Sequence, residues 1–249
     1  MKYNVLVLGS GGREHAFVWS LNKDLNVDKI YCAPGNGGTE DIAINVKLDI
    51  NNPIDVLKFV SENKIDLTIV GPEIPLNNGI VDHFESLGLN IFGPSKKASR
   101  IEGSKIFAKN LMKEFNIPTA KYKTFCDQKS AVKYLEKSSF PIVIKADGLA
   151  AGKGVYISEN YKEASKAVNE IFDGKFGKAE NLLIEEFLNG EEMSFFIISD
   201  GKSYKMFGTA QDHKRVSEGD KGKNTGGMGA YSPSRLESKK LNQKIINKI

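Results

Sequence analysis

The residues that could do chemistry are densest between positions 211 and 231. Two runs in this stretch are Gln211-Asp212-His213-Lys214-Arg215 and Asn224-Thr225-Gly226-Gly227-Met228-Gly229-Ala230-Tyr231. They combine an acid, an imidazole, two cations and three glycines. Glycines at this density let a backbone approach a small ligand closely, and charges of both signs suit a zwitterionic or doubly charged substrate. A polar surface loop is the competing interpretation, and the other motifs decide against it.

A second glycine-rich segment is Gly9-Ser10-Gly11-Gly12-Arg13-Glu14-His15, between a predicted strand and a predicted helix. Backbone amides and the helix dipole at such a junction favour a phosphate. The dinucleotide fingerprint would need a third glycine at Glu14, and Ala33-Pro34-Gly35 stands where an acidic residue should close the second strand. We therefore favour a phosphate on a small substrate over a nicotinamide cofactor.

Three further glycine loops leave the ends of successive predicted strands: residues 35–39, Gly71-Pro72-Glu73 and Gly93-Pro94-Ser95. Ligands of open parallel sheets bind at that edge. A tight turn is the alternative for each loop, and it is the interpretation we keep for Gly93-Pro94.

The segment Gly148-Leu149-Ala150-Ala151-Gly152-Lys153-Gly154 differs from a Walker loop in its glycine spacing and in lacking Ser or Thr after the lysine. A basic glycine-rich hairpin can still cover nucleotide phosphates. Lys145 ends the apolar run 142–144 just upstream, and a buried ammonium is unfavourable unless an anion meets it. Lys105, at a predicted helix start, could equally be surface charge.

An apolar strand then leads into the acidic segment Glu185-Glu186-Phe187-Leu188-Asn189-Gly190-Glu191-Glu192. Its backbone could bind an adenine edge and a carboxylate could hold ribose hydroxyls. Paired glutamates are more often solvated, so this interpretation depends on the neighbouring Lys145 strand and glycine hairpin.

The elements that must position these motifs fall into two groups. In the first, strands at 3–8, 28–33, 67–70 and 89–92 alternate with helices at 13–21, 54–60 and 79–87. This alternation with short glycine connections predicts a doubly wound parallel α/β sheet ending near Gly103.

The second group predicts an α+β unit. A helix at 104–115 precedes strands at 122–125, 141–145, 154–158, 181–186, 192–199 and 204–208, with helices at 128–137 and 161–171. The turn 200–203 predicts a hairpin, so antiparallel pairing replaces the βα alternation. The apolar residues of segment 236–249 recur at helical spacing.

Composition is ordinary for a globular protein: 249 residues, 40% hydrophobic, 27% charged and a net charge of +4. The small charge favours no nucleic-acid partner, and no apolar stretch is long enough for a membrane. Cys32 and Cys126 form no metal or disulfide motif. We expect a cytoplasmic protein with reduced thiols. The sequence does not determine the oligomeric state, and a monomer is the working hypothesis.

These motifs together resemble the glycinamide ribonucleotide synthetases, ATP-grasp ligases of purine biosynthesis, over nearly the whole chain. The matching segments are residues 9–15, Pro34-Gly35-Asn36-Gly37-Gly38-Thr39, 71–73, 145–155 and 211–231. The last is the most specific, because other ATP-grasp ligases share the fold but not that string.

The resemblance implies an ATP-dependent carbon–nitrogen ligase. ATP would phosphorylate the carboxylate of glycine, and the amine of 5-phosphoribosylamine would attack the acyl phosphate, releasing ADP and phosphate. It also implies a substrate domain over 1–103 and an ATP-grasp domain over 104–249, with a small lid subdomain over about 122–190.

The resemblance assigns residues to three sets. Nucleotide would be held by Lys105, Lys145, Gly148, Lys153, Gly154, Glu185, Glu186, Leu188 and Glu192. Phosphoribosylamine would be held by Gly11, Gly12, Glu14, Asn36, Gly37 and Glu73. Glycine would be held by Asp212, Arg215, Asn224 and Thr225, with Asp212, Arg215 and Lys145 as the catalytic groups. His213 would act either in the site or as a structural hydrogen-bonding residue.

Two departures from the family pattern stand out. Lys223 replaces a proline before Asn224, which frees that backbone torsion and adds a charge. Family members also continue past residue 249, where they supply the ligands for magnesium, or alternatively manganese. We therefore expect no metal ligands in these 249 residues and little ligase activity from them alone.

Other functions remain open from the residues. They are a non-catalytic module that binds a nucleotide or phosphosugar, another ATP-grasp purine enzyme such as a carboxylase or transformylase, and a nicotinamide oxidoreductase.

Overall fold

A computed structural model describes residues 2–148, 154–177, 180–219 and 221–249, without the side chains of Arg215 and residues 221–224. Backbone contacts divide the chain into two compact units, Met1–Ala108 and Lys109–Ile249.

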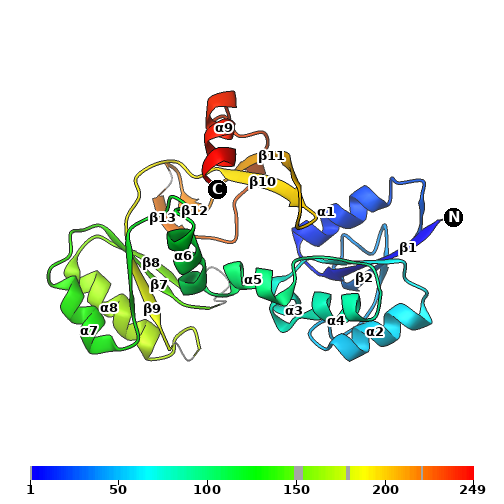
Figure 1. The fold of residues 1–249 in the computed structure, drawn as a ribbon, viewed down its shortest axis with the longest axis horizontal. Helices are drawn as coiled ribbons and strands as arrows, with labels where there is room; N and C mark the ends of the chain where they lie inside the picture. Colours follow the sequence, from blue (N-terminus) through cyan, green and yellow to red (C-terminus); the bar gives the residue numbers. More distant parts are fainter. Residues whose placement is uncertain (1, 149–153, 178–179, 220) are drawn as a thin grey trace. The chain divides into compact units, whose positions relative to one another are not determined.

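Unit 1 is built on a five-stranded sheet in the order β3-β2-β1-β4-β5, with every pairing parallel (Figure 1). The strands are β1 (Tyr3–Gly9), β2 (Val27–Pro34), β3 (Ile44–Asn45), β4 (Leu67–Val70) and β5 (Ile91–Phe92). The helices are α1 (Gly12–Leu21), α2 (Pro53–Glu62), α3 (Glu73–Asn78), α4 (Ile80–Ser86) and α5 (Lys96–Gly103). The predicted doubly wound parallel sheet is confirmed.

The central strand β1 shows why the sheet is covered on both faces. Successive side chains of a strand point to opposite faces. Leu6 and Leu8 pack with residues of α2 and α4, whereas Val5 and Val7 pack with Val18 of α1. The apolar run in the sequence is therefore the expected composition of a strand buried on both sides.

Parallel pairing places the carboxyl ends of β1, β2 and β4 at one edge of this sheet. The register aligns Gly9 with Pro34 across β1 and β2, and Leu8 with Val70 across β1 and β4. The glycine segments predicted to bind phosphate and substrate all begin at this edge.

The structure differs from the sequence-based prediction in three elements of unit 1. The loop predicted at Gly71-Pro72-Glu73 is shorter, because Glu73 begins α3 and lies in its first turn, where a carboxylate is favoured by the helix dipole. Gly79 ends that helix with φ +91°, as expected of a left-handed C-terminal residue. The two-residue strand β3 and the helix α5 were not predicted.

Unit 2 contains a four-stranded antiparallel sheet in the order β6-β9-β7-β8. Its strands are β6 (Tyr122–Phe125), β7 (Ile142–Ala146), β8 (Val155–Ser158) and β9 (Leu182–Glu186). The accompanying helices are α6 (Lys105–Glu114), which begins just before unit 2, α7 (Gln128–Leu135) and α8 (Tyr161–Phe172).

The two faces of this sheet have different roles. Ile142, Ile144 and Ile184 lie on one face in a core cluster with residues of α7 and α8, the helices labelled beside the sheet in Figure 1. Residues paired across an antiparallel sheet share a face. Val143 pairs with Glu185, and Lys145 pairs with Leu183, so these residues occupy the other face.

The rest of unit 2 is a second antiparallel sheet in the order β10-β11-β14, a hairpin of β12 and β13, and α9. The bounds are β10 (Ser194–Ser199), β11 (Tyr204–Asp212), β12 (Arg215–Ser217), β13 (Lys221–Asn224), β14 (Ala230–Tyr231) and α9 (Lys239–Lys248). The prediction that the strand after residue 203 ends at Gly208 was wrong. Gly208 (φ +144°) instead lies beside an irregularity in the β10–β11 register and the strand continues to Asp212.

Candidate active site

Unit 2 contains a cavity of about 590 Å³, within the usual size range of small-molecule sites. One wall is the open face of the β6-β9-β7-β8 sheet together with the segment that follows β9. The opposite wall comes from the end of β11, from β14 and from Arg235. The lining residues that sequence analysis had assigned to nucleotide or glycine are Lys145, Glu185, Glu186, Leu188, Glu192 and Asp212.

A buried ion-pair cluster lies on the sheet wall. Lys145 pairs with Glu185, whose side chain is 4% exposed and whose other carboxylate oxygen, Oε2, is 2.6 Å from Nζ of Lys109. The sequence indicated that Lys145 needs an anion, and Glu185 supplies one. Lys109 was not predicted, although its position one helical turn after Lys105 on α6 was a usable signal.

The segment after β9 forms the rim of the cavity. Glu186 is tied to the sheet, because its Oε1 accepts the Lys121 amide at 2.9 Å. Leu188 is 63% exposed and lines the cavity. Glu192 accepts a hydrogen bond from Lys214 Nζ at 2.7 Å, and this bond raises the pKa of Lys214 above its ordinary value.

The opposite wall carries Asp212 at the last position of β11, paired with Ala230 of β14. The next residue, His213, stacks on the Tyr231 ring with centroids 5.9 Å apart. Its backbone amide donates to Gly229 O and its carbonyl accepts from Met228. The backbone bonds hold the loop at residue 213, and His213 also lines the cavity.

Thr225 is held inside the same loop. Its hydroxyl donates to the Lys214 carbonyl at 3.0 Å and accepts the Gly227 amide at 3.1 Å. Arg215 and Asn224 are paired through their backbones in the β12–β13 hairpin. Their side chains, and that of Lys223, lie outside the part of the chain that the structure describes.

The proposed phosphate-covering loop is only partly described. Gly154 lies next to β8 and its carbonyl accepts the Ala146 amide at 2.8 Å, and Gly148 follows β7 by two residues. Lys153 lies outside the described residues. Lys105 is the first residue of α6.

In unit 1, Glu14 is buried beneath the sheet edge at 5% exposure. Its Oε2 accepts the amide of Gly11 at 2.6 Å and so caps α1. A Cβ on Gly71 would lie 1.9 Å from Glu14 Oε1, and one on Gly9 would lie 2.5 Å from its Cγ. These two glycines therefore make room for Glu14, whereas Gly12 has no heavy atom within 4 Å of the Cβ position.

Asn36 organises the neighbouring loop after β2. Its Oδ1 accepts the amides of Gly38 and Thr39, and its Nδ2 donates to Ser10 O at 2.9 Å. Gly37 has open space around its Cβ position. The structure therefore places Asn36 and Gly37 beside the loop that follows β1.

Glu73 is joined to the same edge through Arg13. Arg13 NH1 is 3.2 Å from Glu73 Oε1 and donates to Gly71 O at 2.6 Å. All six residues predicted to hold the phosphosugar thus lie on the loops or in the first helical turns that follow β1, β2 and β4 at one edge of the parallel sheet.

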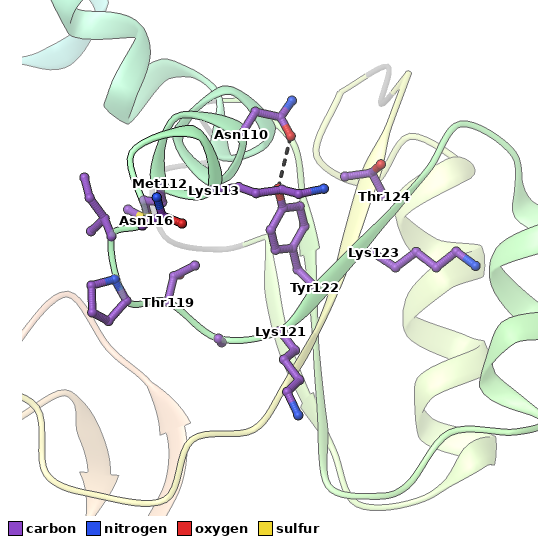
Figure 2. Close-up of a pocket in the computed structure, with 12 residues that line it drawn as sticks. Asn110, Met112, Lys113, Asn116, Thr119, Lys121, Tyr122, Lys123 and Thr124 are labelled. Carbon is purple, nitrogen blue, oxygen red and sulfur yellow. Dashed lines mark hydrogen bonds between the residues drawn. The ribbon is translucent and has the colours of Figure 1, made fainter.

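A second hollow, of about 690 Å³, lies at the end of α6 and the start of β6 (Figure 2). Its wall includes Tyr122, whose hydroxyl donates to Asn110 Oδ1 at 3.1 Å. It contains none of the residues assigned to substrates from the sequence.

Within the described ranges, no group of three or more His, Cys, Asp or Glu side chains could hold a metal ion. In the same ranges, no helix is both long and apolar enough to cross a bilayer.

The fold and the cavity define a class of protein: a parallel-sheet domain followed by an ATP-grasp domain. The phosphoribosylglycinamide synthetase N-domain model matches residues 3–102, and the model of the ATP-grasp (A) domain of the same synthetase matches residues 103–249. The chain therefore belongs to the phosphoribosylglycinamide synthetase family.

Individual relatives agree with this assignment. The chain is 51% identical over 247 residues to the phosphoribosylamine–glycine ligase of Mesorhizobium japonicum, covering 99% of this chain and 58% of that protein. It is 49% identical over 251 residues to the ligase of the same name from Pseudomonas syringae pv. tomato. This match covers 98% of this chain and 57% of that protein. The chain thus spans less than two thirds of the length of these relatives.

Solved structures show the same fold. The phosphoribosylamine–glycine ligase of Thermotoga maritima matches with a TM-score of 0.82 at 32% identity, covering 98% of this chain and 60% of that one. The biotin carboxylase domain of the Hydrogenobacter thermophilus 2-oxoglutarate carboxylase matches with a TM-score of 0.75 at 19% identity. This match covers 100% of this chain and 57% of that one. The second match bears on the fold alone.

Proposed function

We propose that this chain belongs to an enzyme that joins glycine to 5-phosphoribosylamine at the expense of ATP, giving glycinamide ribonucleotide for purine biosynthesis. The observation that carries the proposal is the cavity of unit 2. It has Lys145 and the segment after β9 on one wall, and residues of the family's most specific segment on the other.

ATP is assigned to the sheet side of this cavity. The backbone of Glu186 and Leu188, on the segment that lines the cavity after β9, suits the adenine edge, and Glu192 on the rim suits the ribose hydroxyls. Lys145 lines the same space, so it suits the phosphates, together with Lys105 and the loop 148–154 that includes Lys153. Glu185 assists by holding Lys145.

Glycine is assigned to the opposite wall, with Asp212, Arg215, Asn224 and Thr225. A carboxylate oxygen of glycine attacks the γ-phosphoryl group, the bond to the β-phosphate oxygen breaks, and ADP leaves. The amine of phosphoribosylamine then attacks the acyl carbon, phosphate leaves and the amide nitrogen loses a proton. Such steps depend on positioning and on neutralising charge, which is the role proposed for Lys145 and Arg215.

Phosphoribosylamine is assigned to the sheet edge of unit 1. The open positions at Gly12 and Gly37 lie where α1 and the β2 loop begin, and a helix N-terminus attracts a phosphate. Glu14, besides capping α1 with its own carboxylate, assists there with Gly11, Asn36 and Glu73. Functionally, the domains would be residues 1–103 and 104–249, with a lid of about 122–190 formed by the β6-β9-β7-β8 sheet and its helices.

A divalent ion, magnesium or manganese, would neutralise the phosphates of bound ATP in this family's chemistry. The described residues do not fit a protein-held site, since they include no group of three suitable ligands. We also propose that the protein is a cytoplasmic monomer, with both cysteines in the thiol form seen here.

The test is ADP release in the presence of magnesium and both substrates, measured with a protein of the length of its relatives. The proposal requires release that depends on glycine and on phosphoribosylamine together. Release that needs neither substrate, or that needs bicarbonate or formate, would exclude it.

The second candidate is a module that binds a nucleotide without turnover. One contact favours it: Lys145 and Glu185 form an ion pair with each other. Binding of ATP to the 249-residue chain, with no ADP release by the longer protein under any substrate combination, would support this candidate.

A further inference from the structure

A buried carboxylate shared by two lysines is the unusual feature of unit 2. Glu185 is in the central strand β9 and faces the cavity, where Lys145 of β7 meets it. Lys109 reaches the same carboxylate from α6. The two ammonium groups and the one carboxylate give this largely buried cluster a net charge of +1.

The two lysines are held very differently. The Lys109 ammonium donates to Thr119 Oγ1 at 2.7 Å and to the Ala120 carbonyl at 3.3 Å, besides its ion pair with Glu185. It also lies 5.5 Å from the centre of the Tyr122 ring. An ammonium has three N–H donors, and here it has three acceptors around it.

Lys145 has a looser environment. Its side chain is 29% exposed against 11% for Lys109, and it lines the cavity, which Lys109 does not. Its ion-pair partner among the described residues is Glu185. A ligand with negative charge that enters the cavity can therefore reach Lys145 but not Lys109.

We propose that Lys109 is a fixed counter-ion, a positioning residue that keeps Glu185 neutralised while Lys145 transfers to a phosphate group in the cavity. This inference rests on the proposed binding of ATP, and it adds Lys109 to the residues that support the ATP site. Without Lys109, the transfer would leave a buried carboxylate with no partner, which is strongly unfavourable. With Lys109 in place, Lys145 is an exchangeable cation.

The arrangement of α6 explains why a lysine can act there without touching the ligand. Tyr122 pairs with Glu185 across β6 and β9, and its hydroxyl is fixed by Asn110 of α6, as Figure 2 shows. Thr119 and Ala120 are in the short connection between α6 and β6. The helix, the connection and the strand thus hold the ammonium in one place.

The first test is a double-mutant cycle in which calorimetry measures the binding of ATP to the 249-residue chain. Lys109→Met should raise Kd for ATP about tenfold or more, and Lys109→Arg should stay within about threefold of the wild type. In a Glu185→Gln background, Lys109→Met should change Kd less than about threefold. Lys113→Met removes the same charge from an exposed site on the same helix, and should stay within about twofold.

Two results of the cycle would overturn the proposal. One is ATP affinity of Lys109→Met within about twofold of the wild type; the other is an equal loss in the Glu185→Gln background, which would mean that Lys109 does not act through Glu185.

A second measurement needs neither ATP nor the methionine variant. NMR of the lysine ammonium groups, assigned with Lys109→Arg and Lys145→Arg, should show slower proton exchange for Lys109 than for Lys145 because Lys109 is enclosed. Equal rates, or the reverse order, overturn the inference. If a protein of the relatives' length binds no ATP, the proposed function fails, whereas the exchange measurement still decides which lysine is fixed and which is exchangeable.

Discussion

The burial of Glu14 against two glycines leads to a quantitative prediction for Gly71→Ala. The added methyl carbon would lie 1.9 Å from Glu14 Oε1 and 2.5 Å from its Cδ. The carboxylate must move, and it would then lose the 2.6 Å hydrogen bond from the Gly11 amide that caps α1.

The magnitude follows from three contributions. Overpacking costs about 1–3 kcal/mol, and loss of the cap costs about 0.5–2 kcal/mol. A gain of about 0.4–1 kcal/mol from the stiffer unfolded chain offsets part of this. We therefore expect the free energy of unfolding of unit 1 to fall by about 2–3 kcal/mol.

Urea denaturation followed by tryptophan fluorescence measures this directly, because Trp19 on α1 is the only tryptophan in the sequence. Gly37→Ala is the matched control. No heavy atom lies within 4 Å of its Cβ position, so its effect should stay within about 0.5 kcal/mol.

A double mutant shows whether the clash is the cause. In a Glu14→Ala background the methyl group has no carboxylate to displace, so Gly71→Ala should then change the free energy by less than about 0.5 kcal/mol. A stable Gly71→Ala single variant, or the same loss in both backgrounds, would refute the reasoning.

Three further predictions concern the site and the thiols. In a protein of the relatives' length, Lys145→Ala should remove about 3 kcal/mol of transition-state stabilisation and lower kcat/KM accordingly. A fall in kcat/KM of less than about threefold would count against the role of Lys145. Asp212→Ala or Asp212→Ser should remove the glycine dependence of ADP release, and a normal glycine response would contradict the assignment. Cys126 is exposed and Cys32 buried, so a thiol reagent should modify Cys126 first in the native protein, and equal rates would be contrary to the structure. Burial raises the pKa of Cys32, so the unfolded chain loses that proton first and stability should fall as pH rises past 9.0; Cys32→Ala should reduce this slope in urea titrations at alkaline pH.

The fold of unit 1 could be predicted because its signals are local. The run Val5 to Leu8 is apolar at every position, and the glycines that follow mark the end of the strand. By contrast, the strand Ile44–Asn45 makes only a two-residue pairing with β2. Such a short strand has no periodicity of its own and depends on its neighbour.

The ion-pair cluster could not be predicted for a different reason. Lys145 clearly needed an anion, but its partner is set by strand register, which brings Val143 opposite Glu185 and Lys145 opposite Leu183. The contribution of Lys109 depends in addition on how α6 approaches β6. Neither relation appears in the local sequence. The residues on the cavity walls were chosen by family resemblance, and their roles stay predictions.

The most direct test of the account is the structure of this chain with ATP bound. It should show the adenine at the backbone of residues 186–188, and a phosphate oxygen within hydrogen-bonding distance of Lys145 Nζ, with Lys109 still on Glu185. A nucleotide bound elsewhere, or a cavity filled by the chain's own apolar side chains, would contradict the account.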